Sequence, residues 1–189
     1  FTGKHKTAKF EGGYHGSHEY VAVSVHPPLE KLDPAGPTPI PEHPGMPPSV
    51  LEDVIVLPYN DLEWCERVLR ENKDDLACLI MEPVVSSFGY LPAQKKFLQG
   101  LRDITTELDI ILIFDEVQTG MGATGRMWAH QHAAVEPDMI AFGKKSQVSG
   151  LMASTRLKEF EDNVFEVPSR INSTFGGNIT DFVRARLIL

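Results

Sequence analysis

The sequence predicts an α/β fold with a mostly parallel sheet and helices on both faces. Short apolar runs rich in β-branched residues recur along the chain, as in 54–57 and 110–114, and such runs are typical of buried parallel strands. The stretches between several of them repeat apolar residues at helical spacing, as in 62–72. Strands that alternate with helices indicate βαβ units, and a length of 189 residues favours one domain.

Each predicted element follows from a local pattern. Asp61 suits the N-cap of the helix over 62–72, and Pro92 suits the first turn of the next helix, whose apolar stripe runs from Phe97 to Ile104. Strands are expected at 6–11, 20–25, 54–57, 76–81, 110–114, 139–142 and 147–155, and further helices at 127–134 and 180–189. Most of the 14 prolines lie in 26–48, which predicts an extended loop, either functional or a disordered arm.

Composition narrows the range of partners. The net charge is −8 and no block of Lys or Arg is present, so we expect neither nucleic acid nor membrane as a partner. No apolar run approaches the roughly 20 residues that span a bilayer. Cys65 and Cys78 lack metal-ligand spacing and are expected to be free thiols in the cytoplasm. His130 and His132 would face different sides of a helix, so no metal site is expected.

An acid and an amine follow two of the predicted strands. The run 110–114 stops at Asp115 and Glu116, and the run 139–142 is followed by Gly143, Lys144 and Lys145. Because ligands bind at the carboxyl ends of parallel strands, Asp115 and a lysine can face one pocket. A lysine that forms a Schiff base and an acid that partners a pyridinium nitrogen are the protein groups that pyridoxal phosphate requires.

Five motifs in order, FEGGYHG, IMEPV, FDEVQTG, AFGKK and NSTFGGN, resemble those of the class III aminotransferases, which are fold type I pyridoxal phosphate enzymes. The resemblance covers essentially the whole chain. It implies that Lys144 is the catalytic Schiff base lysine, with Lys145 as the alternative, and that Asp115 keeps the pyridine nitrogen protonated. Glu116 has no role in this pattern beyond capping the next turn.

The resemblance also implies roles for the remaining motif residues. Tyr14 and Val117 would pack on the two faces of the cofactor ring, and the amide of Gln118 would bind its phenolic oxygen. His15 and Glu82 would support the cofactor site from nearby, Thr174 would bind the cofactor phosphate of the other subunit in a homodimer with shared active sites, and Asn172 would lie near the substrate carboxylate.

Two subfamilies share the resemblance. The N-terminal half resembles glutamate-1-semialdehyde aminomutase, and the C-terminal half resembles lysine 6-aminotransferase, although Ser87 stands where the lysine-type enzymes carry a substrate-selecting glutamate. The implied function is transfer of an amino group from an amino acid or ω-amine, lysine-type donors included, to a 2-oxo acid. An aminomutase and an inactive remnant that binds no cofactor are the alternatives. The 189 residues are expected to be part of a large pyridoxal-phosphate-binding domain, without the N-terminal segment and the small C-terminal domain.

Overall fold

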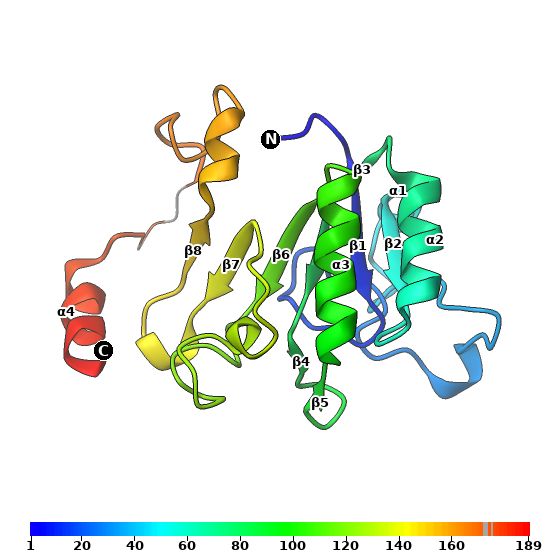
Figure 1. Cartoon of the computed structure of the whole chain (residues 1–189), viewed down its shortest axis with the longest axis horizontal. Helices are drawn as coiled ribbons and strands as arrows, with labels where there is room; N and C mark the ends of the chain where they lie inside the picture. Colours follow the sequence, from blue (N-terminus) through cyan, green and yellow to red (C-terminus); the bar gives the residue numbers. More distant parts are fainter. Residues whose placement is uncertain (172–173, 175) are drawn as a thin grey trace.

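The computed structural model describes residues 1–171, 174 and 176–189 (Figure 1). Its centre is a six-stranded sheet in the order β2-β1-β3-β6-β7-β8, and every neighbouring pair is parallel except β7 and β8. The prediction of a mostly parallel α/β sheet is therefore confirmed. The strands are β1 (Lys6–Phe10), β2 (Val54–Leu57), β3 (Leu76–Met81), β6 (Ile111–Asp115), β7 (Met139–Phe142) and β8 (Gly150–Ala153). A separate hairpin pairs β4 (Val84–Val85) with β5 (Leu91–Pro92).

Helices cover both faces of this sheet, and the last helix of the chain lies apart from it (Figure 1). The α-helices are α1 (Pro48–Asp53), α2 (Leu62–Asn72), α3 (Lys95–Glu107) and α4 (Ile179–Ile188), and the short 3₁₀ helices are η1 (Leu29–Lys31), η2 (Ala129–His132), η3 (Lys144–Ser146) and η4 (Thr155–Glu159). Within the described residues, no helix has both the length and the apolar character needed to cross a bilayer.

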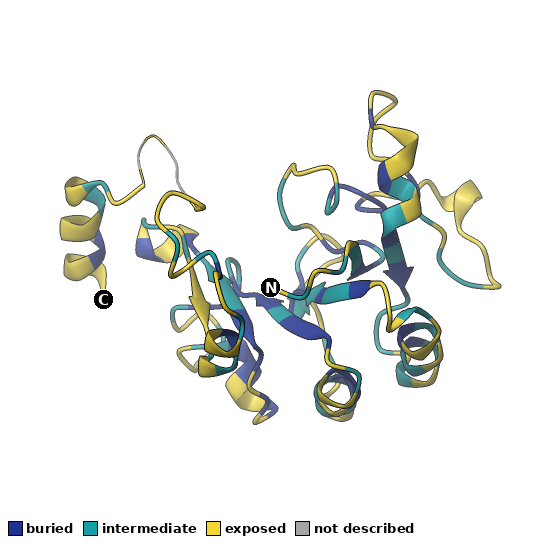
Figure 2. Cartoon of the chain, turned by 90° about the horizontal axis from the view of Figure 1, so that it is seen from above, coloured by how far each residue is buried: buried dark blue, intermediate teal, exposed yellow. Residues whose placement is uncertain are grey.

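The side chains of β2 point alternately to the two faces of the sheet, and each face packs against a different set of helices. Ile55 and Leu57 point into the main core with α2 and α3, whereas Val54 and Val56 point to the other face and pack with Val50 of α1. Figure 2 shows α2 and α3 below the sheet and the buried interior between the layers. Helices therefore lie on both faces, as the period-2 pattern of strand side chains requires.

The strongest local patterns gave the right boundaries. The ranges predicted for β2, α2, β3 and β7 match the structure. The Asp61 side chain accepts a hydrogen bond from the Trp64 backbone N–H at 3.0 Å, which satisfies one of the free donors at the start of α2.

Two expectations were wrong, and one helix was not predicted. The segment 20–25 forms no strand: the adjacent residues Ala22 and Val23 both pack in the cluster with β2 and α1, and only an isolated bridge joins Val23 to Pro41. Pro92 lies in β5, because α3 begins later, at Lys95. The proline-rich segment ends in an unpredicted helix, α1, which starts at Pro48. Proline is tolerated at the first position of a helix, because a backbone N–H there would have no helical partner.

Candidate active site

Four strand ends place most of the predicted site residues around one cavity. Tyr14 and His15 follow β1, Glu82 follows β3, Asp115 ends β6 and Lys144 follows β7. Because these strands are parallel, their carboxyl ends share one edge of the sheet (Figure 1). The cavity there has a volume of about 240 Å³, and Val117, Gln118, Gly16, Ser86 and Ala141 complete its lining. The structure thus brings seven of the predicted site residues together at the carboxyl ends of the strands, where ligands bind in α/β sheets.

Asp115 is held by two donors. His15 Nδ1 lies 2.9 Å from Asp115 Oδ2, and the Val117 backbone N–H donates to Asp115 Oδ1 at 3.1 Å. Since an ionised carboxylate only accepts, the hydrogen of His15 is assigned to Nδ1. His15 is buried, and its Nε2 atom has no hydrogen-bond partner among the described residues. This arrangement fixes the carboxylate and leaves it acceptor capacity for a third donor inside the cavity.

Glu82 joins two loops across the cavity. It accepts hydrogen bonds from the Tyr14 backbone N–H at 3.1 Å and from the Ser86 hydroxyl at 2.9 Å. The Glu82 carboxylate therefore ties the Gly-rich turn after β1 to the hairpin after β3. Ser86 was missed by the sequence analysis, because a serine in a short loop carries no pattern of its own.

Lys144 stands in an unusual backbone conformation. Its φ is 52°, in the left-handed region, at the first position of η3; such conformations cost energy for a residue with a side chain and concentrate at functional sites. Within the described part of the chain, no hydrogen bond or ion pair engages Lys144 Nζ, whereas Lys145 Nζ donates to the Gln118 carbonyl oxygen. Of these two lysines, Lys144 lines the cavity and Lys145 does not.

Glu116 has a structural role that the sequence did not reveal. Its fully buried carboxylate accepts hydrogen bonds from the Ala129 and His130 backbone N–H groups, the His130 ring and the Thr119 hydroxyl, at 2.7 to 2.9 Å. Burial alone would raise the pKa of Glu116, but these hydrogen bonds outweigh it, so the pKa is lowered. Glu116 therefore anchors η2 and the glycine-rich loop before it to the end of β6. The His132 ring contacts Thr124.

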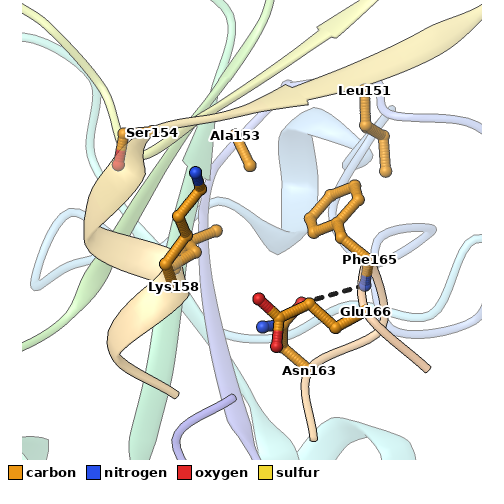
Figure 3. Close-up of a pocket in the computed structure, with 8 residues that line it drawn as sticks. Leu151, Ala153, Ser154, Lys158, Asn163, Phe165 and Glu166 are labelled. Carbon is orange, nitrogen blue, oxygen red and sulfur yellow. Dashed lines mark hydrogen bonds between the residues drawn. The ribbon is translucent and has the colours of Figure 1, made fainter. Parts of the chain in front are cut away.

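Two predicted roles stay untested. Thr174 is exposed and does not line this cavity, and Asn172 lies outside the described residues, so both roles stay predictions. Figure 3 shows a second cavity, of about 340 Å³, between β8 and residues 157–166. Since Ala153 pairs with the first residue of β7, that cavity lies at the opposite edge of the sheet and contains no predicted site residue. Among the described residues, no three His, Cys, Asp or Glu side chains gather as metal ligands would.

A free amine and a held carboxylate at the carboxyl edge of a parallel sheet define a small-molecule site of the kind found in α/β enzymes. The family model described as Aminotransferase class-III matches residues 1–188, and the chain belongs to this family.

Curated relatives and solved structures agree with this assignment. The L-lysine-epsilon aminotransferase of Mycobacterium tuberculosis is 41% identical over 181 residues, which cover 94% of this chain and 40% of the relative. A glutamate-1-semialdehyde 2,1-aminomutase of Methanothermobacter thermautotrophicus is 39% identical over 145 residues, 76% of this chain and 32% of the relative. The structure of an omega-transaminase from Sphaerobacter thermophilus superposes with a TM-score of 0.85 at 32% identity, covering 97% of this chain and 43% of that one. The chain therefore spans about two fifths of the length of the lysine aminotransferase.

Proposed function

We propose that this chain is the cofactor-binding part of a pyridoxal-phosphate-dependent aminotransferase. The observation that carries the proposal is the shared cavity of Lys144 and Asp115, in a chain that belongs to the class-III aminotransferase family. A structural relative described as a transaminase with PLP bound, 28% identical with a TM-score of 0.79, supports the choice of cofactor. When bound, pyridoxal phosphate supplies an electron sink for negative charge on the substrate carbon.

The donor set fits this cofactor. Lys144 Nζ would hold the cofactor covalently and then carry a proton to and from the substrate carbon, because an amine free of other partners is available for both tasks. Asp115, oriented by His15 and the Val117 N–H, would keep a proton on the ring nitrogen. In a cavity partly shielded from water this charge pairing is stronger than in solvent.

The other lining residues would hold the ring. Tyr14 and Val117 would contact its two faces, and the Gln118 amide would bind its phenolic oxygen; Glu82 would act indirectly, by fixing the Tyr14 backbone. We further propose that Thr174 binds the cofactor phosphate of the other subunit in a homodimer and that Asn172 lies near the substrate carboxylate. The free thiols of Cys65 and Cys78 fit a cytoplasmic enzyme.

The proposed reaction is transfer of an amino group from an amino acid or ω-amine to a 2-oxo acid. The 41% identity to lysine aminotransferases supports a lysine-type donor. The 39% identity to an aminomutase supports a second candidate, rearrangement of an amino aldehyde. These two reactions are separable, since an aminomutase completes its turnover without added 2-oxo acid.

The test uses the full-length protein loaded with pyridoxal phosphate. We expect a visible absorption band, and after borohydride reduction and peptide mapping we expect the cofactor on Lys144. Lys144→Ala should abolish the band, while the matched variant Lys145→Ala should keep it. Cofactor trapped on another residue, or no cofactor bound at all, would refute the proposal and favour the inactive remnant.

A further inference from the structure

One wall of the cavity is a hairpin that is separate from the main sheet. We define the wall hairpin as residues 82–92, which contain the antiparallel pair of β4 and β5. Its Glu82 and Ser86 line the cavity. Its tip rests on the turn after β1: the Ser87 hydroxyl donates to the Gly12 carbonyl oxygen at 2.9 Å, and the Phe88 ring occupies the space where a Gly12 side chain would lie.

Two consecutive residues after β2 contact both ends of the wall hairpin. At its start, the Tyr59 hydroxyl lies 2.9 Å from the Glu82 carbonyl oxygen and 3.1 Å from that of Pro83, and donates its one hydrogen between them. At its end, the Asn60 Nδ2 group donates to the Pro92 carbonyl oxygen at 3.2 Å, and Asn60 Oδ1 accepts from the Gln94 N–H at 2.8 Å.

We call Tyr59 and Asn60 together the brace. Both residues are themselves held in place. The Tyr59 ring packs edge-on against Phe10 at a centroid distance of 5.5 Å and lies 5.7 Å from the Phe97 ring, so it is anchored in the main core. Burial raises the pKa of Tyr59 far above its ordinary value, with a further contribution from Glu82, so its hydroxyl keeps its hydrogen at physiological pH. Asn60 has a φ of 65°, a left-handed conformation that asparagine tolerates and that directs its amide towards the hairpin end.

We propose that Tyr59 and Asn60 are positioning residues for the active site: together they fix both ends of the wall hairpin and so hold Glu82 and Ser86 against the cavity. Neither residue lines the cavity, so they act through the backbone of the hairpin. This inference rests on the proposed function for its kinetic consequence, because a wall that shifts misplaces a bound substrate, and misplacement by about 1 Å is costly in rate.

The test compares full-length variants loaded with pyridoxal phosphate. Tyr59→Phe keeps the ring in the core and removes only the hydroxyl, and Asn60→Gly keeps the left-handed backbone and removes both side-chain bonds. For Tyr59→Phe we expect amide hydrogen exchange in 84–92 to accelerate by about tenfold, the effect of losing one hydrogen bond. For Asn60→Gly, which loses two, we expect at least the same acceleration. We also expect kcat/KM for the amino donor to fall by about tenfold or more, with an unchanged cofactor absorption band. Tyr20→Phe is the control, since the Tyr20 hydroxyl bonds Asp53 on the other face of the sheet.

The two readouts separate the brace from the proposed function. Exchange needs no turnover, so wild-type exchange rates in 84–92 for both variants would overturn the brace whatever the enzyme does. Faster exchange with an unchanged kcat/KM would overturn the positioning role. Failure of the unmodified enzyme to transfer an amino group would refute the proposed function, and exchange alone would then decide on the brace.

Discussion

Lys9 offers a quantitative test of the fold beneath the active site. Its side chain is fully buried, and its amine donates to the Phe10 carbonyl oxygen at 3.0 Å and the Val23 carbonyl oxygen at 2.6 Å. Burial lowers the pKa of Lys9 from 10.5 to about 8, against the opposing attraction of Glu42, Glu82 and Glu11. This difference corresponds to about 3 kcal/mol, at 1.36 kcal/mol for each pH unit.

The sign follows from the protons bound in each state. Below about pH 8 the amine is charged in both the folded and the unfolded protein, and the folded protein bears the full cost of burying that charge. Between about 8 and 10.5 the folded protein has released the proton while the unfolded protein still binds it. The free energy of unfolding therefore gains a contribution that rises with pH across this window. Methionine at this position has no proton to release and removes the contribution.

The assay is urea unfolding of the full-length protein and its Lys9→Met variant between about pH 7 and 10. The burial of Cys65 raises its pKa to about 12 and acts in the opposite direction above its ordinary value of 9.0, so the informative quantity is the difference between the two proteins. Cys65 contributes equally to both and cancels. We expect wild type to gain about 2.5 kcal/mol over the variant across this range. A difference that stays constant would refute the neutral buried amine.

Three further predictions concern the site. Asp115→Asn should retain the cofactor but lower kcat/KM by at least about a hundredfold, because a preorganised charge is lost; unchanged transaminase kinetics would contradict its role. Glu116→Gln should lower the free energy of unfolding at pH 7 by about 2–4 kcal/mol. This loss should become smaller as the pH falls below 4.5, the ordinary pKa of a glutamate, because protonation then removes the same charge from wild type. Gly12→Ala should lower the free energy of unfolding by about 2–4 kcal/mol, because its φ is 75° and the new carbon would overlap the Phe88 ring. The matched control is Gly16→Ala, which is also left-handed but has open space around the new carbon. In urea unfolding it should show only the loss that comes from the left-handed backbone.

Sequence patterns predicted the parts of this protein that local physics decides. The ends of β6 and β7 follow from apolar runs, and the common direction of parallel strands then brings Asp115 and Lys144 to one edge. The segment 20–25 was misleading because its weak alternation in sequence does not correspond to alternate burial: residues 22 to 25 are all buried in the folded chain. The bonds from Glu116 to His130 and from Tyr59 to Glu82 join loops that have no periodicity, so only the folded backbone determines them.

Three left-handed residues explain how the chain leaves the sheet at the site. Gly12 follows β1, Asn60 follows β2 and Lys144 follows β7, with φ values of 75°, 65° and 52°. Gly12 adopts this conformation without a steric cost, and Asn60 has two side-chain hydrogen bonds that offset it. Lys144 has a side chain, and among the described residues that side chain makes no hydrogen bond that would offset the cost. The neighbouring backbone therefore holds it: Gly143 approaches Ser149 too closely for a side chain, and the turn into β8 follows. A lysine at such a position costs stability that glycine would not, and that cost is consistent with selection for the amine that it presents to the cavity.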